Sequence, residues 1–278
     1  MMTFPHLHRL AALCVSAIAG IIPAARAAAL PDAIAGRGAM TVAVVPNYPP
    51  MEFRDPASNT LEGFDIDLGT ALAQRLGVRL VWQETAFAQM IPALSTGRVD
   101  AILSGMSDIA SRHDAASFVD YLRSGPQFFV QASRAAEFAD PQTLCGKTVG
   151  TSRRTSFPHD IAVWSAAHCA DKPIVVVGTE GSADARTQLR QGRIDAAVQG
   201  RETLPYLMAQ EPGAYAAIGT PIADGFTGIA VAKSDTALAA AIAAALDGMI
   251  ADGSYAALLA RWTLSPAAIA KATINAGQ

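Results

Sequence analysis

Two stretches of the sequence carry residue types that bind a carboxylate. Ser104-Gly-Met-Ser107 is followed by Arg112, whose planar guanidinium can donate two parallel hydrogen bonds to a carboxylate. Gly105 lets a ligand approach the backbone closely, and Ser107 adds a hydroxyl. Further along, Thr155-Ser-Phe-Pro158 has the pattern of a helix start, where unpaired backbone N–H groups attract an anion. These residues predict a site for a small anionic ligand.

Two of these residues also have a purely structural interpretation. Arg112 could form a salt bridge with Asp108 or Asp114 instead of binding a ligand. Ser107 could cap a helix that we expect to begin at Asp108, although a cap can still contact a ligand. Both interpretations stay open at the level of sequence.

An internal repeat indicates which elements position these segments. Leu94-Ser-Thr-Gly-Arg-Val-Asp-Ala-Ile-Leu-Ser-Gly105 and Leu189-Arg-Gln-Gly-Arg-Ile-Asp-Ala-Ala-Val-Gln-Gly200 share the frame L-x-x-G-R-[VI]-D-A-x-[LV]-x-G. In each copy we predict a helix that a glycine stops, Gly97 or Gly192, and then a short strand, 99–103 or 194–198. The repeated aspartates, Asp100 and Asp195, would begin these strands and are interpreted as structural. Two copies in the same order predict two similar α/β lobes.

The rest of the sequence alternates in the same way between predicted strands and helices. This alternation predicts parallel sheets with helices covering them. In open parallel sheets, ligands bind beyond the carboxyl ends of the strands. If the two lobes face each other, one cleft is lined by the segments that follow four of the predicted strands, namely 46–53, 104–112, 152–157 and 199–202.

Composition and motifs exclude several functional classes. The 278 residues are 51% hydrophobic and 16% charged, which is unlike a disordered chain. The formal net charge of -3 provides no basic excess for a nucleic-acid partner. The sequence contains no phosphate-binding or dinucleotide-binding glycine motif, no H-E-x-x-H, no G-x-S-x-G and no CxxC pair. We therefore expect neither a metal nor a cofactor.

The N-terminus has the three parts of a secretory signal peptide. A basic start is followed by the uncharged run 10–22 and by Ala25-Arg-Ala27, which predicts cleavage near Ala27 and a signal peptide over 1–27. The alternative, a membrane anchor, is disfavoured because the run is shorter than the ~20 residues that span a bilayer. Cys14 follows Leu13, whereas a lipid attachment site prefers a small residue there.

Two cysteines remain after this cleavage, Cys145 and Cys169. An even number in an exported chain predicts a disulfide, because exported compartments are oxidising. Two buried thiols are the alternative.

Over about residues 38–264 the sequence resembles the extracytoplasmic solute-binding proteins of ABC importers, in the polar amino-acid-binding class called family 3. The motifs that carry this resemblance are Tyr48-Pro-Pro-Met-Glu-Phe53, Gly63-Phe-Asp-Ile-Asp-Leu68, Ile91-Pro-Ala-Leu94, Gly97-Arg-Val-Asp100, and Asp252-Gly-Ser-Tyr-Ala256 with Trp262.

The resemblance implies the α/β periplasmic-binding-protein fold, in which two lobes enclose a ligand cleft and close about a hinge. Two crossover strands, 127–131 and 226–231, would join the lobes. Lobe 1 would comprise 38–130 and 228–278, and lobe 2 would comprise 131–227.

The resemblance also implies roles for individual residues. The ligand carboxylate would be bound by Ser107, Arg112, Thr155 and Ser156. Tyr48 and Phe87 would form an aromatic wall against the ligand. Gly105, Met106 and Ser152 would border the pocket, and Gln199 and Glu202 would approach it from the end of the second repeat strand.

One position departs from the family pattern. Typical members carry an Asp at the end of the second repeat strand that holds the ligand α-ammonium, and this sequence has Gly200 there. A buried ammonium without a carboxylate partner is strongly disfavoured. Three interpretations follow. Glu202 supplies the negative charge that pairs with the ammonium, the ligand lacks a primary ammonium, or the protein no longer functions in transport.

The expected function is that of a soluble periplasmic receptor. It would bind a small amino acid or related carboxylate and deliver it to a membrane-embedded ABC permease by hinge closure. We expect a monomer, because closure needs a free hinge. The alternative is an enzyme on the same fold, a periplasmic dehydratase of prephenate or arogenate, in which Glu202 would act in an apolar pocket. A sensory domain is a third possibility and would require a separate partner protein.

Overall fold

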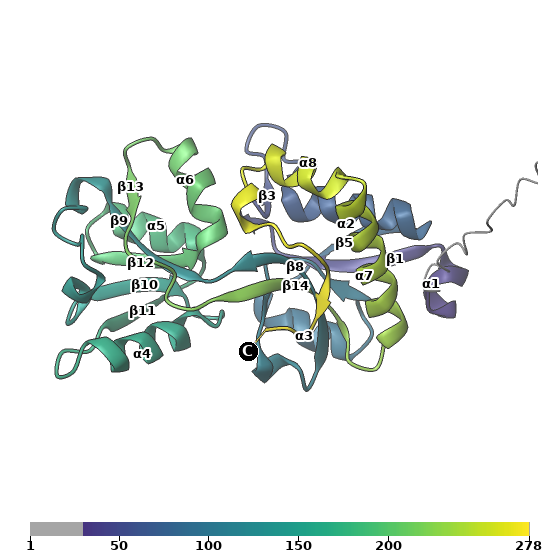
Figure 1. Cartoon of the computed structure of the whole chain (residues 1–278), viewed down its shortest axis with the longest axis horizontal. Coiled ribbons are helices and arrows are strands. Elements are labelled where there is room, and N and C mark those ends of the chain that lie inside the picture. The colour runs from purple at the N-terminus through teal and green to yellow at the C-terminus, as the bar shows by residue number, and fades with distance from the viewer. Residues whose placement is uncertain (1–29, 278) are drawn as a thin grey trace, which may run out of the picture.

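A computed structural model describes residues 30–277, which form the predicted two-lobe α/β fold (Figure 1). The predicted signal peptide, its cleavage site and Cys14 lie outside these residues. Within the described part, no single helix has the length and hydrophobicity to cross a membrane; α7 and α8 reach those values only as a pair bent by 82°.

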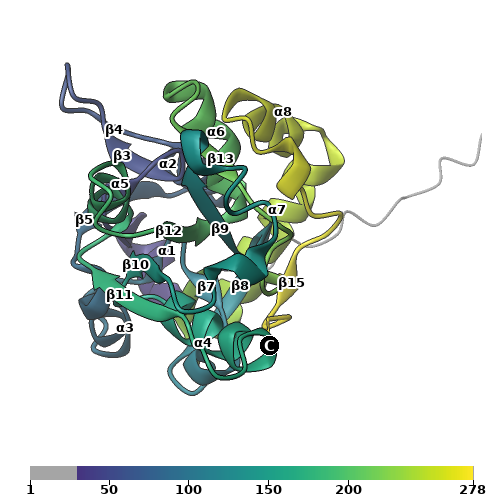
Figure 2. The same ribbon diagram turned by 90° about the vertical axis from the view of Figure 1, so that its left-hand side faces the viewer.

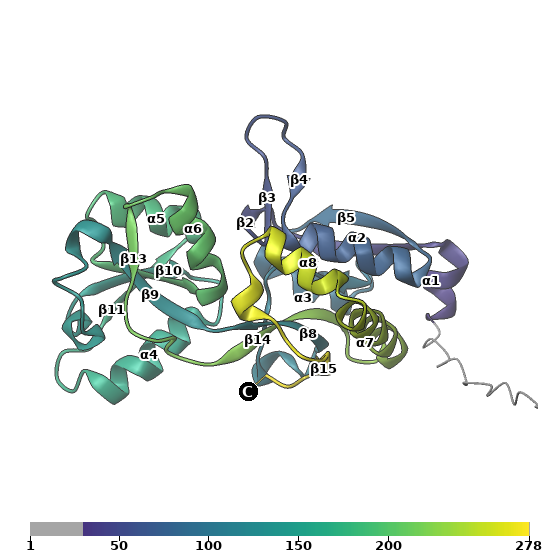
Figure 3. The ribbon, with the colours of Figure 1, turned by 45° about the horizontal axis from the view of Figure 1, so that its top comes forward.

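Lobe 1 is built on a sheet with the strand order β15-β8-β14-β6-β1-β5, with β7 paired to β14. Its parallel part is β6-β1-β5, and β14, β8 and β15 add antiparallel pairs. A small hairpin sheet, β2-β3-β4, projects from it (Figure 3). The first part of the chain supplies α1 (Asp32–Arg37), β1 (Ala39–Val44), β2 (Asn47–Tyr48), β3 (Glu52–Arg54), β4 (Leu61–Glu62), α2 (Phe64–Leu76), β5 (Arg79–Glu84), α3 (Phe87–Ser95), β6 (Ala101–Ile102), β7 (Ser107–Asp108) and β8 (Ala116–Ser124). The last part supplies β14 (Gly225–Ala232), α7 (Thr236–Ala251), α8 (Ser254–Arg261) and β15 (Thr273–Ile274).

Lobe 2 is built on the sheet β11-β10-β12-β9-β13. Helices α4 and α5 lie on opposite sides of this sheet (Figure 2). Neighbouring residues of β9 therefore enter different cores: Phe128 packs with Ile161 of α4, and Phe129 packs with Leu189 of α5. The elements are β9 (Pro126–Gln131), β10 (Thr148–Ser152), α4 (Phe157–His168), β11 (Val175–Thr179), α5 (Ser182–Arg190), β12 (Ala196–Gly200), α6 (Leu204–Gln210) and β13 (Tyr215–Ala217).

The chain passes between the lobes twice. On the way out it changes sheet at Gly125, between β8 and β9, and it returns between β13 and β14. Both changes fall a few residues before the predicted boundaries at 130/131 and 227/228, because β9 already pairs with β12 at Pro126 and β14 already pairs with β8 at Gly225. The two passages touch: a β-carbon on Gly125 (φ 157°) would lie 2.1 Å from the carbonyl oxygen of Ala223. Only glycine fits there.

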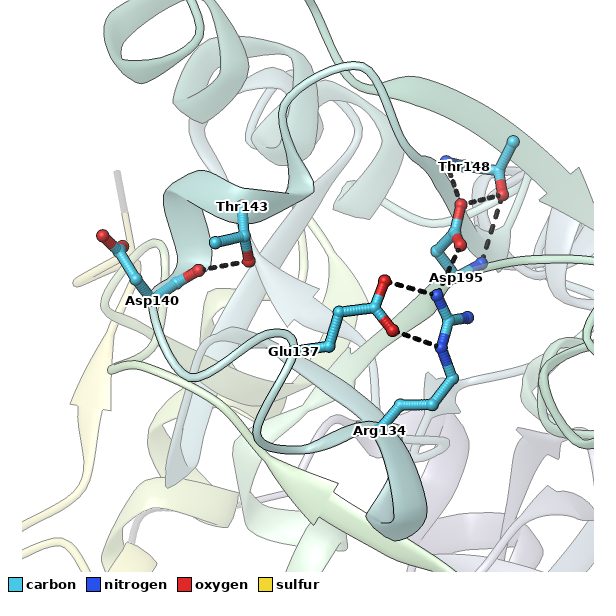
Figure 4. A network of polar contacts seen from close by, with 6 residues as sticks. All are labelled: Arg134, Glu137, Asp140, Thr143, Thr148 and Asp195. Atoms are coloured by element: carbon cyan, nitrogen blue, oxygen red, sulfur yellow. Dashed lines mark hydrogen bonds and ion pairs between the residues drawn. The ribbon is translucent and has the colours of Figure 1, made fainter.

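The internal repeat has the same structural role in both lobes. Oδ2 of Asp100 accepts a hydrogen bond from the backbone N–H of Thr41, the third residue of β1 (2.7 Å). Asp195 accepts from the backbone N–H and the hydroxyl of Thr148 (3.0 and 2.9 Å), the first residue of β10. Arg134 donates to Asp195 and also to Glu137 (Figure 4). Each repeated aspartate thus fixes the neighbouring parallel strand, in agreement with the structural interpretation.

The predicted disulfide is confirmed. Cys145 and Cys169 are joined in the structure, and they tie the start of β10 to the end of α4. Cys169 is buried in the core on the α4 side of lobe 2.

Aromatic side chains also join the lobes away from the chain connections. Tyr206 of α6, in lobe 2, lies with its ring centroid 6.4 Å from those of both Phe53 and Trp262, in lobe 1. The two lobe 1 rings meet edge to face at 6.0 Å. The structure therefore has the lobes in contact.

A buried carboxyl in lobe 1 predicts how stability depends on pH. Asp120, on β8, is 0% exposed; its Oδ2 accepts hydrogen bonds from Thr273 and Ala276, and its Oδ1 has no partner among the described residues. Burial raises its pKa to about 7, so the folded protein retains a proton that the unfolded chain loses near its ordinary pKa of ~3.9. The resulting stabilisation is complete below pH ~4 and is lost as pH rises through about 7.

We expect the melting temperature of wild type to fall more steeply between pH 5 and pH 8 than that of Asp120→Asn, which cannot ionise. Scanning calorimetry across this range measures both slopes. Buried acids away from Asp120, such as Glu52 and Glu202, contribute equally to the two proteins, so the difference reports on Asp120 together with its neighbour Asp108. Equal slopes would contradict the assignment.

Candidate ligand-binding site

A cavity of about 290 Å³ lies between the two lobes. Its wall is formed where strands end: residues after β1 and β6 contribute from lobe 1, and residues after β10 and β11 contribute from lobe 2. This is the position that the parallel sheets predict. The fourth predicted segment, 199–202, contributes no residue to this cavity, and β12, the strand that leads into it, contributes only Val198.

Seven of the eleven residues expected at the cleft line this cavity. Five come from lobe 1: Tyr48, Phe87, Gly105, Ser107 and Arg112. Two come from lobe 2: Ser152 and Thr155.

Arg112 is a largely buried cation with unused donors. Its Nη1 donates to the backbone oxygen of Ser107 (2.7 Å), and its guanidinium carbon lies 5.8 Å from the Phe87 ring centroid. Burial lowers the pKa of this guanidinium. It forms no salt bridge with any described residue: Asp108 pairs with His113 instead, and Asp114 lies 3.8 Å from Lys233 Nζ. The geometry leaves the remaining N–H groups of Arg112 available for an anion in the cavity.

The segment around Ser107 differs from the predicted helix start. Ser107 and Asp108 form β7, which pairs with β14, and only a single 3-10 turn, Ala110–Arg112, follows. The buried Asp108 carboxylate accepts from the backbone N–H of Gly277 (2.7 Å), so the C-terminal segment helps to hold this strand.

On the facing lobe, α4 begins where the sequence predicts a helix start. The Thr155 hydroxyl donates to the carbonyl of Ser152 (2.9 Å) and accepts from the backbone N–H of Phe157 (3.3 Å), and Pro158 lies in the first turn. Thr155 and Phe157 both line the cavity. The positive end of this 12-residue helix therefore faces the same space as Arg112.

Four of the predicted site residues do not line this cavity. Met106 is 1% exposed and packs in the lobe 1 core on the α3 side. The Gln199 amide donates to the hydroxyl of Thr203 (2.7 Å), so it points along its own turn. Ser156 borders a smaller crevice beside Asp160. The fourth is Glu202.

Glu202 is buried beside the cavity instead of inside it. It accepts hydrogen bonds from the Tyr48 hydroxyl (3.4 Å) at Oε1 and from the Ser124 hydroxyl (2.8 Å) at Oε2. Its carboxyl lies directly against Gly200. Burial raises its pKa to about 7.

Glu52, a buried acid in the cavity wall, is not among the residues that the sequence predicts at the cleft. Glu52 is 1% exposed; its Oε1 accepts from the hydroxyl of Ser104 (2.8 Å), and its Oε2 has no partner among the described residues. Burial, and then the charge of Asp65, raise its pKa well above the ordinary value. Glu52 lies directly opposite Tyr48 in the β2–β3 pair. Residues directly opposite each other in an antiparallel pair have side chains on the same face of the sheet. A hairpin predicted over residues 48–53 would therefore have placed Glu52 beside Tyr48 at the cleft.

Comparison with known proteins agrees with the family resemblance that the sequence motifs indicate. Residues 40–265 match the family model for bacterial extracellular solute-binding proteins, family 3. The sequence is 30% identical over 251 residues to the arginine-binding protein ArgT of Corynebacterium glutamicum, covering 89% of this chain and 82% of that protein. It is 29% identical over 224 residues to the histidine-binding periplasmic protein of Escherichia coli, covering 78% and 84%.

Solved structures agree with these sequence matches. An ancestral arginine-binding protein bound to arginine has a TM-score of 0.73 at 28% identity, covering 81% of this chain and 98% of that one. The ancestral amino-acid-binding protein AncCDT-1, described as a precursor of cyclohexadienyl dehydratase, has a TM-score of 0.74 at 27% identity, covering 83% and 98%.

Proposed function

The chain belongs to the bacterial extracellular solute-binding proteins, family 3, and on that basis we propose that it is a receptor for a cationic amino acid, with arginine as the first ligand to test. Relatives named for binding arginine and histidine support an amino acid of this kind. Two arginines in the cavity wall, Arg112 and Arg154, make no salt bridge with a described residue, and the same wall contains the buried acid Glu52, which can pair with the positive side chain of such a ligand.

Arg112 is the observation that carries the proposal. Its guanidinium is largely buried, makes no salt bridge with a described residue, and faces the α4 N-terminus of the other lobe. An α-carboxylate bound there would contact both lobes at once. Because it could do so only in the closed form, its differential affinity would drive closure.

Glu52 supplies the partner for a positive group. Glu52 lines the cavity, its Oε2 is buried without a hydrogen bond to a described residue, and the acid Asp65 lies beside it, so a negative charge here is stable only if a cation pairs with it. A guanidinium or ammonium entering the cavity would bind this carboxyl and release the proton that burial holds on it.

In the cell we propose export by cleavage of residues 1–27 and delivery of the ligand to an ABC permease that recognises the closed form. We expect no catalytic turnover. The dehydratase alternative assigned its acid to Glu202, which does not line the cavity.

A thermal-shift screen of the refolded mature protein tests the receptor proposal. The panel contains arginine, lysine, ornithine, histidine, glutamine, betaine-type and dicarboxylate ligands, and prephenate. A ligand at a hundredfold excess over its dissociation constant should stabilise the protein by ~2.7 kcal/mol. We expect the largest shift from arginine. A shift from dicarboxylates alone would contradict a cationic ligand, and consumption of prephenate would favour the enzyme.

The role of Glu52 makes a separate prediction. Glu52→Gln should weaken arginine binding about 10- to 100-fold, because a hydrogen bond to a charged group contributes ~1.5–3 kcal/mol. In wild type, affinity should rise with pH as the Glu52 proton becomes easier to remove, and the variant should lose this dependence. Isothermal titration calorimetry in buffers of different ionisation enthalpy measures the affinity and the released proton together.

The matched control is Glu84→Gln, which removes an exposed acid paired with Arg54. It should bind arginine as wild type does. A Glu52→Gln protein with wild-type affinity and unchanged proton release would place the cationic group elsewhere.

A further inference from the structure

Position 200 requires a glycine because of the space around it, and not because of its backbone conformation. Its φ and ψ of -60° and 131° suit any residue. A β-carbon at this position, however, would lie 2.0 Å from Oε1 of Glu202 and 2.6 Å from its Oε2. The Glu202 carboxyl therefore occupies the space that a side chain at position 200 would need.

From that space Glu202 contacts the other lobe and the hinge. Its Oε1 accepts from the hydroxyl of Tyr48, which belongs to the β2–β3 hairpin of lobe 1. Its Oε2 accepts from Ser124, the last residue of β8 before the chain enters lobe 2. The Tyr48 hydroxyl in turn accepts from the backbone N–H of Gly200 (2.9 Å).

These contacts join the lobes without using a ligand. Glu202 is 6% exposed, so its hydrogen bonds are shielded from water. They also keep the Tyr48 ring in the cavity wall, where a ligand would pack against it. Opening the cleft would break the Tyr48 contacts and uncover the buried carboxyl.

We propose that Glu202 is a positioning residue for closure: its carboxyl holds the Tyr48 hydroxyl across the two lobes, and Gly200 is required because any side chain there would displace it. The closed form is thus partly stabilised by the protein itself. This inference deepens the proposed receptor function, because a larger closed fraction before binding gives a tighter apparent affinity.

The test measures closure without a ligand. Spin labels at the exposed positions Ala57, in the hairpin loop between β3 and β4, and Ala209, in α6, report the distance between the lobes by pulsed electron resonance. The variants are Glu202→Ala, Glu202→Gln, Tyr48→Phe, Gly200→Ala, and the double variant Gly200→Ala with Glu202→Ala. Melting curves and circular dichroism check that each is folded.

We expect Glu202→Ala, Tyr48→Phe and Gly200→Ala to lengthen the distance distribution of the unliganded protein. Glu202→Gln should keep the short distance, since an amide can still accept from Tyr48 and donate to Ser124. If Gly200→Ala acts only by displacing Glu202, the double variant should match Glu202→Ala alone. Where arginine binds, the three opening variants should bind it about tenfold more weakly.

Independent, additive effects of the Gly200 and Glu202 substitutions would overturn the proposal. So would a distance distribution that Tyr48→Phe leaves unchanged, and this variant decides the question if Glu202→Ala does not fold. Because the distances are measured without ligand, they remain informative if no member of the amino-acid panel binds.

Discussion

Replacing Arg112 by methionine is expected to weaken ligand binding at least a hundredfold. The guanidinium is the cation that the cavity offers to a ligand carboxylate from lobe 1, and removing one partner of a buried ion pair costs ~3–5 kcal/mol. Arg112→Lys should lie between wild type and Arg112→Met, since it keeps the charge and loses the two-pronged geometry. Isothermal titration calorimetry with arginine, or with the best ligand of the screen, measures all three.

The matched control for this loss of charge is Arg75→Met. Arg75 is an exposed residue of α2 that pairs with Asp252, and neither of these two residues lines the cavity. It should bind the ligand with wild-type affinity. Affinity retained within a few fold in Arg112→Met would mean that the carboxylate is bound elsewhere.

The second large effect is expected from removing the Cys145–Cys169 disulfide. The bridge closes a loop with a sequence separation of 24, and in the chain-entropy treatment such a crosslink contributes ~3.5 kcal/mol by restricting the unfolded chain. Replacing both cysteines by alanine should therefore lower the free energy of unfolding by about that amount. Chemical denaturation monitored by circular dichroism measures it.

Ligand affinity should change little in this double variant, because neither cysteine lines the cavity. Dithiothreitol supplies the control: it should destabilise wild type to the level of the variant and leave the variant itself unchanged. Equal stability of the oxidised protein and the variant would show that the crosslink adds nothing to folding.

The sequence predicts the fold well because its strongest signal is repeated. The L-x-x-G-R-[VI]-D frame marks the same turn twice, and the structure has α3–β6 and α5–β12 at the two places. The lobe limits shift by a few residues because they depend on which sheet β9 and β14 pair with, and hydrophobic patterns do not encode a pairing partner.

The site was predictable in part. Strand ends identified the segments, and residue chemistry singled out Arg112. Glu202 shows where sequence reasoning stops. It follows β12 by two residues, so it was expected at the ligand, yet the 3-10 turn Arg201–Thr203 folds its carboxyl back against Gly200. The direction of a side chain in a short turn depends on the space around it, and that space is set by residues distant in sequence such as Tyr48 and Ser124.

The position of β14 sets the order in which the molecule can fold. This strand lies between β8 and β6 in the lobe 1 sheet, but it follows the whole of lobe 2 along the chain. Lobe 2 can form from contiguous sequence, whereas the first half of lobe 1 keeps unpaired strand edges until β14 has joined its sheet. Such long-range pairing slows folding and prolongs exposure to aggregation. We therefore expect the discontinuous lobe to complete its folding last, after β14 has entered its sheet.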